Sequence, residues 1–378
     1  MLPLIAFATL FILIHGQNRD PDHRLQWIGS FLLAAVFWGV IVIASAEILT
    51  LFRAVNRLWI SITWLAATII LVAVGMRNGD LRKMLARIRR IDRPRATFDL
   101  MVLGGIALVA AILLVVAIIA PPNNVDSFLY HMARVVHWAQ NESLEHYPAY
   151  IDHQLNKPIW AETAILHLRI LWGSDRPANL VQWFSMLGSI IGVVGITGLL
   201  GADRKGRLFA ALFALTIPMG LLQATSTQND YVTAFWAVCL AYFVVLSMKR
   251  ALTALEYLGL ASAFGIGILT KGVFFVYFPP LLIWYFLNLL RKKGLLRTFG
   301  LGTAMLGIAL VINFGFWARN IQTYGGPYGT SEWLQRNLGF DVDFLNRLFE
   351  SEEGSQPSGG LQLRLPPDVQ PGAEVFRF

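Results

Sequence analysis

The feature of this sequence that most limits its fold is a succession of long apolar runs separated by short polar segments. Within a bilayer the backbone amides must be paired inside the chain, so such runs form helices. Each crossing uses roughly 20 residues, and we therefore predict an all-α, polytopic membrane helix bundle of about ten spans. The runs cover roughly 1–15, 27–52, 57–76, 99–120, 177–201, 207–222, 231–248, 254–270, 273–290 and 298–317.

Composition supports this class and excludes others. Only 14% of the residues are charged and 56% are hydrophobic, whereas a soluble chain carries about 25% charge. The net charge of +8 comes from basic residues placed between apolar runs, which indicates membrane topology rather than a nucleic-acid partner. The single cysteine, Cys239, excludes an intramolecular disulfide and a zinc site built on several cysteines.

Lysine and arginine also predict the orientation. If the spans alternate from residue 99, four basic segments share one side, and the positive-inside rule makes that side the cytoplasm. These segments are 77–98, 202–207, 249–250 and 291–297. The loops 121–176 and 223–230 then lie outside.

The external loop 121–176 does not resemble a linker. From Asp126 to Asn141, apolar and polar residues alternate at helical spacing, which predicts an amphipathic helix lying in the membrane interface. A second such helix is expected from Ile159 to Trp172. The loop holds five histidines, but their spacing matches no common zinc-ligand set.

Two carboxylates begin helices on this external side. Asp126 follows the span 99–120, and Asp230 opens the span 231–248 after a polar loop. Each is explained equally well as a helix cap. Alternatively they converge on one site, where such a pair could deprotonate a hydroxyl or hold a divalent cation through oxygen ligands.

Basic residues are few on the external side. Lys157, Lys271 and Arg319 oppose the positive-inside bias, so we expect a separate benefit such as binding a phosphate at the membrane surface. Snorkelling towards lipid headgroups is the simpler alternative. The sequence has no nucleotide-binding P-loop.

Four motifs in this order resemble those of the GT-C superfamily of integral-membrane glycosyltransferases. The resemblance is strongest to the branch with lipid A aminoarabinose transferases and protein O-mannosyltransferases, and it covers about residues 99–330. The motifs are Asp126-Ser127-Phe128-Leu129-Tyr130-His131, Asn156-Lys157-Pro158, Thr227-Gln228-Asn229-Asp230-Tyr231, and Trp317-Ala318-Arg319-Asn320 with Gly326-Pro327.

The resemblance implies a polyprenyl-phosphate-linked sugar as donor, a lipid, glycan or protein acceptor, and transfer at the outer face of a membrane, which we expect to be the bacterial inner membrane. On this basis Asp126 is the expected base, and Asp230 orients it or shares a divalent cation with it. Lys157 and Arg319 are expected to bind the leaving phosphate, and direct displacement would invert the anomeric centre. The further expected substrate-binding residues are Tyr130, His131, Arg134 and Tyr231.

The chain departs from the family pattern at two places. The paired acidic dipeptide is here Asp126-Ser127, and relatives usually continue through further spans into an external domain. We expect extra spans in 1–76, a basic segment in 77–98, the conserved module in 99–330 and a disordered or truncated tail in 331–378. The alternatives to an enzyme are a binder, flippase or transporter of lipid-linked saccharides, or an inactive remnant.

Overall fold

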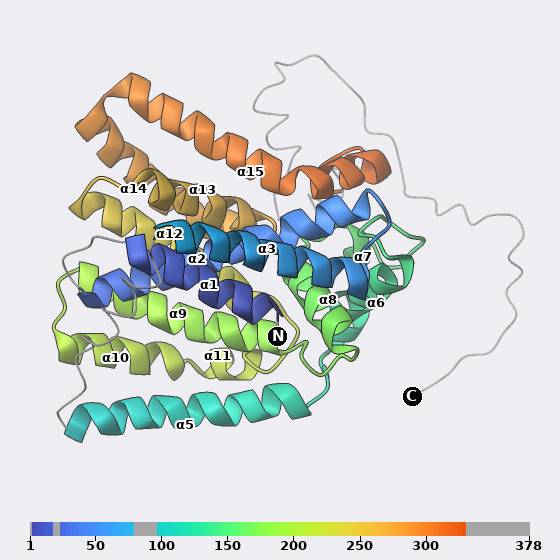
Figure 1. The fold of residues 1–378 in the computed structure, drawn as a ribbon, viewed down its shortest axis with the longest axis horizontal. Coiled ribbons are helices and arrows are strands. Elements are labelled where there is room, and N and C mark those ends of the chain that lie inside the picture. Colours follow the sequence, from blue (N-terminus) through green and yellow to red (C-terminus); the bar gives the residue numbers. More distant parts are fainter. Residues whose placement is uncertain (1, 18–22, 79–96, 330–378) are drawn as a thin grey trace, which may run out of the picture. The chain divides into compact units, whose positions relative to one another are not determined.

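The computed structural model of the protein describes residues 2–17, 23–78 and 97–329 (Figure 1). This part of the chain is helical and contains no β-strand, which confirms the predicted fold class. The expected tail, 331–378, and most of the basic segment, 79–96, lie outside the described residues.

Within the described residues, seven helices are long and apolar enough to cross a membrane. The remaining helices are shorter, and two of them, α1 (Leu2–Gln17) and α13 (Ala254–Ile268), are apolar. The seven are α2 (His23–Thr50), α3 (Arg57–Asn78), α5 (Thr97–Ile119), α9 (Leu180–Leu199), α12 (Asp230–Lys249), α14 (Phe274–Lys293) and α15 (Leu295–Tyr324).

The predicted span over 207–222 is instead two short helices, α10 (Arg204–Leu215) and α11 (Pro218–Gln223). Ile217 has an extended backbone, with ψ of 114°. The cause is Pro218, because proline disfavours the helical conformation in the residue before it and lacks the amide that would continue the helix. A run of suitable hydropathy was therefore not one continuous span.

Polar loops gather at the two ends of the helices. Thr50 Oγ1 accepts from the amide of Leu144 at 3.1 Å, and the amide of Val55 donates to Glu142 O at 2.9 Å. The α2–α3 turn thus lies at the same end as the loop 121–176. We call this the loop end; it also holds 224–229 and 269–273. The opposite, basic end holds 200–206, 249–253 and 291–294.

In the described part of the loop 121–176, four short helical elements lie at the loop end, and Figure 1 shows them gathered beside the α2–α3 turn. They confirm the two amphipathic helices expected in the loop. The elements are a π-helical turn η1 (Ser127–His131), α6 (Met132–Asn141), α7 (His153–Asn156) and α8 (Trp160–Trp172).

Helix α12 is the centre of the bundle. In the apolar window of α12, 72% is buried, against 6% for α5. Glycines on α9 make its close approach to α12 possible: a Cβ on Gly192 would lie 2.3 Å from Val238 Cγ1, and one on Gly188 would lie 2.5 Å from the Phe235 ring. Small residues at such spacing allow membrane helices to pack tightly. Asp230, the first residue of α12, is therefore held by a rigid helix.

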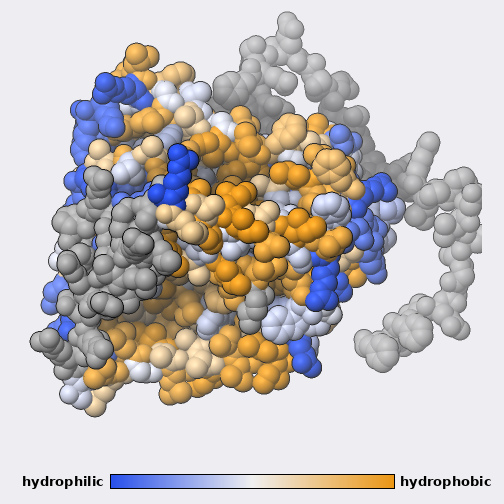
Figure 2. Space-filling model, in the orientation of Figure 1, coloured by the Kyte–Doolittle hydropathy of each residue, from blue (hydrophilic) through white to orange (hydrophobic). Residues whose placement is uncertain are grey.

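The N-terminal helices belong to the same core as the rest of the bundle. Trp160 Nε1 of α8 donates to Gly39 O of α2 at 3.0 Å, and Trp64 Nε1 of α3 donates to His167 Nδ1 of α8 at 3.0 Å. Figure 2 shows apolar residues across the middle of the visible face and hydrophilic residues towards its two sides. Such a band is what a bilayer requires.

Candidate active site

Asp126 lies between α5 and η1 and is half-buried. It makes no cap hydrogen bond to η1. Asn124 takes that role, since its Oδ1 accepts from both the amide and the hydroxyl of Ser127 at 2.8 Å. The capping explanation that the sequence left open for Asp126 therefore does not apply, and its carboxylate is available for other contacts.

The two acidic motifs meet at the loop end. Gln228 Nε2 donates to Asp126 Oδ2 at 3.4 Å, and the hydroxyls of Ser127 and Thr227, 100 residues apart in the chain, lie 2.5 Å from each other. These contacts bring the first external loop against the start of α12. Asp126 is thus beside the segment that carries Asp230.

Asp230 is the first residue of α12, and Asn229 occupies its cap position without a side-chain cap bond. Lys271 Nζ donates to Asp230 Oδ1 at 2.7 Å, with both side chains partly exposed. The turn carrying Lys271 is fixed by two hydrogen bonds, from Asn229 Nδ2 to Thr270 O at 3.0 Å and from the amide of Trp160 to Leu269 O at 2.9 Å. Lys271 was noted in the sequence as a basic residue that could bind a phosphate, but it was not among the predicted site residues.

Lys157 lies between α7 and α8, close enough to Lys271 and Asp126 to interact with them electrostatically. Burial lowers its pKa from the ordinary 10.5, and the positive charges of Lys271 and Arg134 lower it further, while Asp126 opposes them. Two lysines and a carboxylate thus influence one another at the loop end. Such a cluster suits an anionic substrate group better than an isolated surface lysine does.

Tyr130 belongs to this cluster as well. Burial raises its pKa, and the carboxylates of Glu162, Asp126 and Asp230 raise it further. The phenol therefore stays protonated and can donate a hydrogen bond. Tyr231, by contrast, does not join the cluster: its hydroxyl packs at Gly220 of α11, where an added Cβ would lie 2.2 Å away.

Arg134 organises the loop from inside. Its side chain is fully buried and donates to four backbone carbonyls, those of His153 at 2.7 Å, Gln154 at 3.0 Å, and Lys157 and Pro158 at 3.1 Å. These bonds hold in place the segment 153–158, which carries Lys157. Arg134 is therefore a positioning residue, because its buried guanidinium is not exposed to a substrate.

The side chain of His131 is also bound within the protein. Its Nδ1 lies 2.5 Å from Glu162 Oε1, and both side chains are buried. Burial disfavours the Glu162 carboxylate, but Arg134 and His131 outweigh that effect and hold its pKa below the usual range. The expected substrate contact of His131 is therefore replaced by a buried Arg134–Glu162–His131 group beneath the site.

Arg319 of α15 forms a two-pronged ion pair with Glu47 of α2, with both N–O distances 2.7 Å. Its side chain is 8% exposed. Arg319 was expected to bind the phosphate, but in the structure its two terminal nitrogens donate to the Glu47 carboxylate. The pair ties the N-terminal helices to the end of the bundle.

Gly315 is needed for this ion pair, because a Cβ there would lie 2.2 Å from Glu47 Oε2. We expect Gly315→Ala to displace the carboxylate from Arg319 and to destabilise the protein by about 1–3 kcal/mol. The thermal unfolding midpoint of the detergent-solubilised protein measures this. Gly307→Ala on the same helix is the matched control, since nothing lies within 4 Å of its added Cβ. Equal midpoints for the two variants would contradict the expectation.

Within the described residues, no group of three or more histidine, cysteine, aspartate or glutamate side chains could hold a metal ion. Asp126 contacts Gln228, and Asp230 contacts Lys271. The divalent cation that the two carboxylates could share stays a prediction.

Residues 158–317 match the family model of dolichyl-phosphate-mannose-protein mannosyltransferases. No curated protein and no solved structure matches the chain. The matched segment includes Asp230 and Lys271, while Asp126 and η1 precede it. The resemblance to the GT-C superfamily is thereby confirmed over residues 158–317, the part of the chain that matches a membrane glycosyltransferase family of this type.

Proposed function

We propose that the protein transfers a sugar from a polyprenyl-phosphate-linked donor to an acceptor hydroxyl at the loop end of the bundle. The observation that carries this proposal is the convergence of Asp126, Asp230, Lys157 and Lys271 from three separate segments. The positive-inside rule makes the loop end the outer side of the membrane, and we propose the bacterial inner membrane as its location.

The reaction is a single displacement. The acceptor oxygen forms a bond to the anomeric carbon, the bond from that carbon to the phosphate oxygen breaks, and polyprenyl phosphate leaves. Asp126 takes the hydroxyl proton as the new bond forms. Because attack and departure occur on opposite faces, the anomeric configuration inverts.

Lys157 and Lys271 stabilise the leaving phosphate, whose negative charge grows as the bond breaks. Asp230 holds Lys271 in place through their 2.7 Å contact. Lys271 binds the phosphate in place of Arg319, because Arg319 is paired with Glu47. Tyr130 remains protonated and donates to a sugar or phosphate oxygen.

The test is transfer of radiolabel from a panel of polyprenyl-phosphate sugars by membranes containing the wild-type protein, with and without a chelator. The acceptor, whether lipid, glycan or protein, is identified by where the label appears. Inhibition by the chelator would support the predicted divalent cation, and insensitivity would remove it. Movement of the intact donor across the bilayer without transfer would instead identify a flippase or transporter.

The lowered pKa of Lys157 predicts the alkaline limit of this activity. The ammonium form that stabilises the phosphate exists below its pKa, so transfer should decline as pH rises through a value lower than the ordinary 10.5. Lys157→Arg keeps its charge to higher pH and should shift the decline upward. A pH–rate profile measures both. The matched control is Lys205→Arg at the basic end, and identical profiles for all three proteins would contradict the assignment.

A further inference from the structure

A cavity of about 410 Å³ lies at the basic end, among the adjoining ends of four helices. It opens beside the C-terminal part of α12, about 25 Å along that helix from Asp230. It is therefore separate from the candidate active site. It lies between Ser247 of α12, the turn 251–253, Tyr257 of α13, Tyr285 of α14 and Leu301 of α15.

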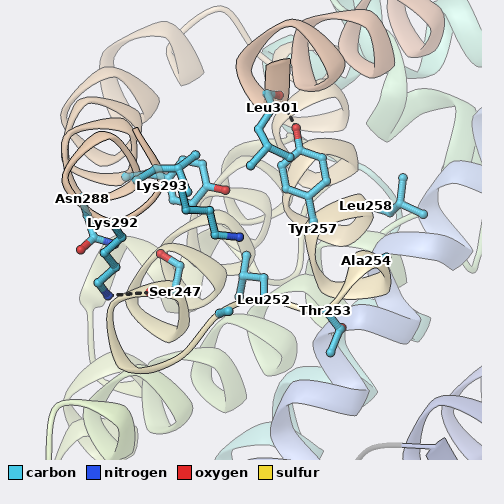
Figure 3. A pocket seen from close by; sticks show the side chains of 13 residues that line it. Ser247, Leu252, Thr253, Ala254, Tyr257, Leu258, Asn288, Lys292, Lys293 and Leu301 are labelled. Carbon is cyan, nitrogen blue, oxygen red and sulfur yellow. Dashed lines mark hydrogen bonds between the residues drawn. The ribbon is translucent and has the colours of Figure 1, made fainter. Parts of the chain in front are cut away.

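The walls of this cavity are mostly apolar. Leucine side chains and tyrosine rings form them, and Tyr257 donates a hydrogen bond to Leu301 O, which joins α13 to α15 (Figure 3). Leu258 at its side is 43% exposed, although it lies on an apolar helix within the membrane bundle. Hydrocarbon chains of the surrounding bilayer can therefore reach the cavity from the side.

Two lysines of α14 form its polar rim. Lys292 Nζ donates to Met248 O at 3.1 Å and to Ser247 O at 3.5 Å, and so caps the end of α12. Lys293 forms no hydrogen bond or ion pair with the part of the chain that the structure describes, and Figure 3 shows its amino group reaching over the space between Ser247 and Tyr257. Lys293 is thus the cation available to a bound group.

The charges around the cavity select an anion. No aspartate or glutamate is among its lining residues, and the nearby Glu256 carboxylate is bound by Arg250 at 2.6 and 2.8 Å. A headgroup carrying an ammonium would find no acidic partner here. A phosphate with attached hydrocarbon would match both parts of the cavity, since the phosphate would contact the lysine rim and the hydrocarbon would contact the apolar walls.

We propose that this cavity binds one anionic phospholipid from the leaflet at the basic end. Its phosphate contacts Lys293, its glycerol region lies beside Ser247 and Asn288, and the first part of an acyl chain fills the space along Leu289 and Leu301. Basic pockets between membrane helices on the cytoplasmic side favour such headgroups. The volume suits a headgroup with the beginning of its chains.

The experiment is native mass spectrometry of the full-length protein released from detergent with added lipid. We expect phosphatidylglycerol to remain bound at one copy per protein and phosphatidylcholine with the same chains to dissociate. Lys293→Gln should retain about fivefold less phosphatidylglycerol, since one lysine near the headgroup contributes about 1 kcal/mol. Ala251→Trp, which fills the cavity rim from an exposed turn, should lose the lipid without changing any charge.

Arg297→Gln is the matched control, because Arg297 is exposed at the same end and does not line the cavity. It should retain the lipid as the wild type does. Equal losses in Lys293→Gln and Arg297→Gln would overturn the proposal, as would equal retention of the two lipids. Displacement by inorganic phosphate would show a phosphate site without lipid specificity and would also overturn it. These outcomes do not depend on sugar transfer.

Discussion

Asp126→Asn is expected to lower sugar transfer by about 10²–10⁴-fold, the usual contribution of a positioned general base. Asparagine keeps the size of the side chain and an oxygen that can accept from Gln228 Nε2. It cannot take the proton of the acceptor hydroxyl. The substitution thus removes the proton transfer while the contact between the two loops is retained.

The measurement is the initial rate of label transfer, normalised to the amount of inserted protein. Donor binding, measured as the Michaelis constant, should change much less than the turnover rate. Glu145→Gln is the control, because Glu145 is an exposed carboxylate in the same loop, and its rate should equal that of the wild type. A rate for Asp126→Asn within a factor of about two of the wild type would exclude Asp126 as the base.

Arg134→Met is expected to have the largest effect on stability, a loss of about 3–5 kcal/mol. Methionine has a similar length but donates no hydrogen bond, so four backbone carbonyls lose their partner. The buried Glu162 carboxylate, 3.8 Å from the guanidinium, also loses its main countercharge. The segment 153–158 should then leave its position, and Lys157 with it.

Thermal unfolding in detergent and protease sensitivity within 141–158 measure this effect. Arg134→Lys retains the charge but cannot reach four carbonyls, so we expect an intermediate stability. Arg169→Met in the neighbouring α8 is the control, since Arg169 is partly exposed and pairs with Asp175 at the surface. Surface pairs contribute at most about 1 kcal/mol. If Arg134→Met unfolds at the same temperature as Arg169→Met, Arg134 does not organise the loop.

The membrane helices were predictable because hydropathy and run length are local properties. Seven apolar runs became helices of spanning length, and the amphipathic pattern after Asp126 became η1 and α6. The prediction of a single span over 207–222 was wrong, because it followed the mean hydropathy of the run and gave too little weight to Pro218. The proline was visible in the sequence and was the signal to use.

The candidate site was only partly predictable. Asp126, Asp230 and Lys157 were selected because charged residues are rare at the ends of apolar runs. Lys271 carried the same signal, but nothing in the sequence paired it with Asp230. Gln228 and Glu162, which also contact the site residues, had no comparable local signal. The pairing of Arg319 with Glu47 joins residues 272 positions apart, and no spacing rule relates them.

Hydrophobic run length and the placement of basic residues were enough to establish a helical membrane protein and to group the polar loops by side. They were enough because lipid imposes the same demand on every span, namely that its backbone be paired within itself. Which charges remain open to a substrate was decided by tertiary packing alone. Arg134, His131 and Arg319 are bound by partners within the protein, whereas Lys271 is brought to Asp230. Whether a charged side chain is open to a substrate depends on its neighbours, and only the folded chain brings those neighbours together.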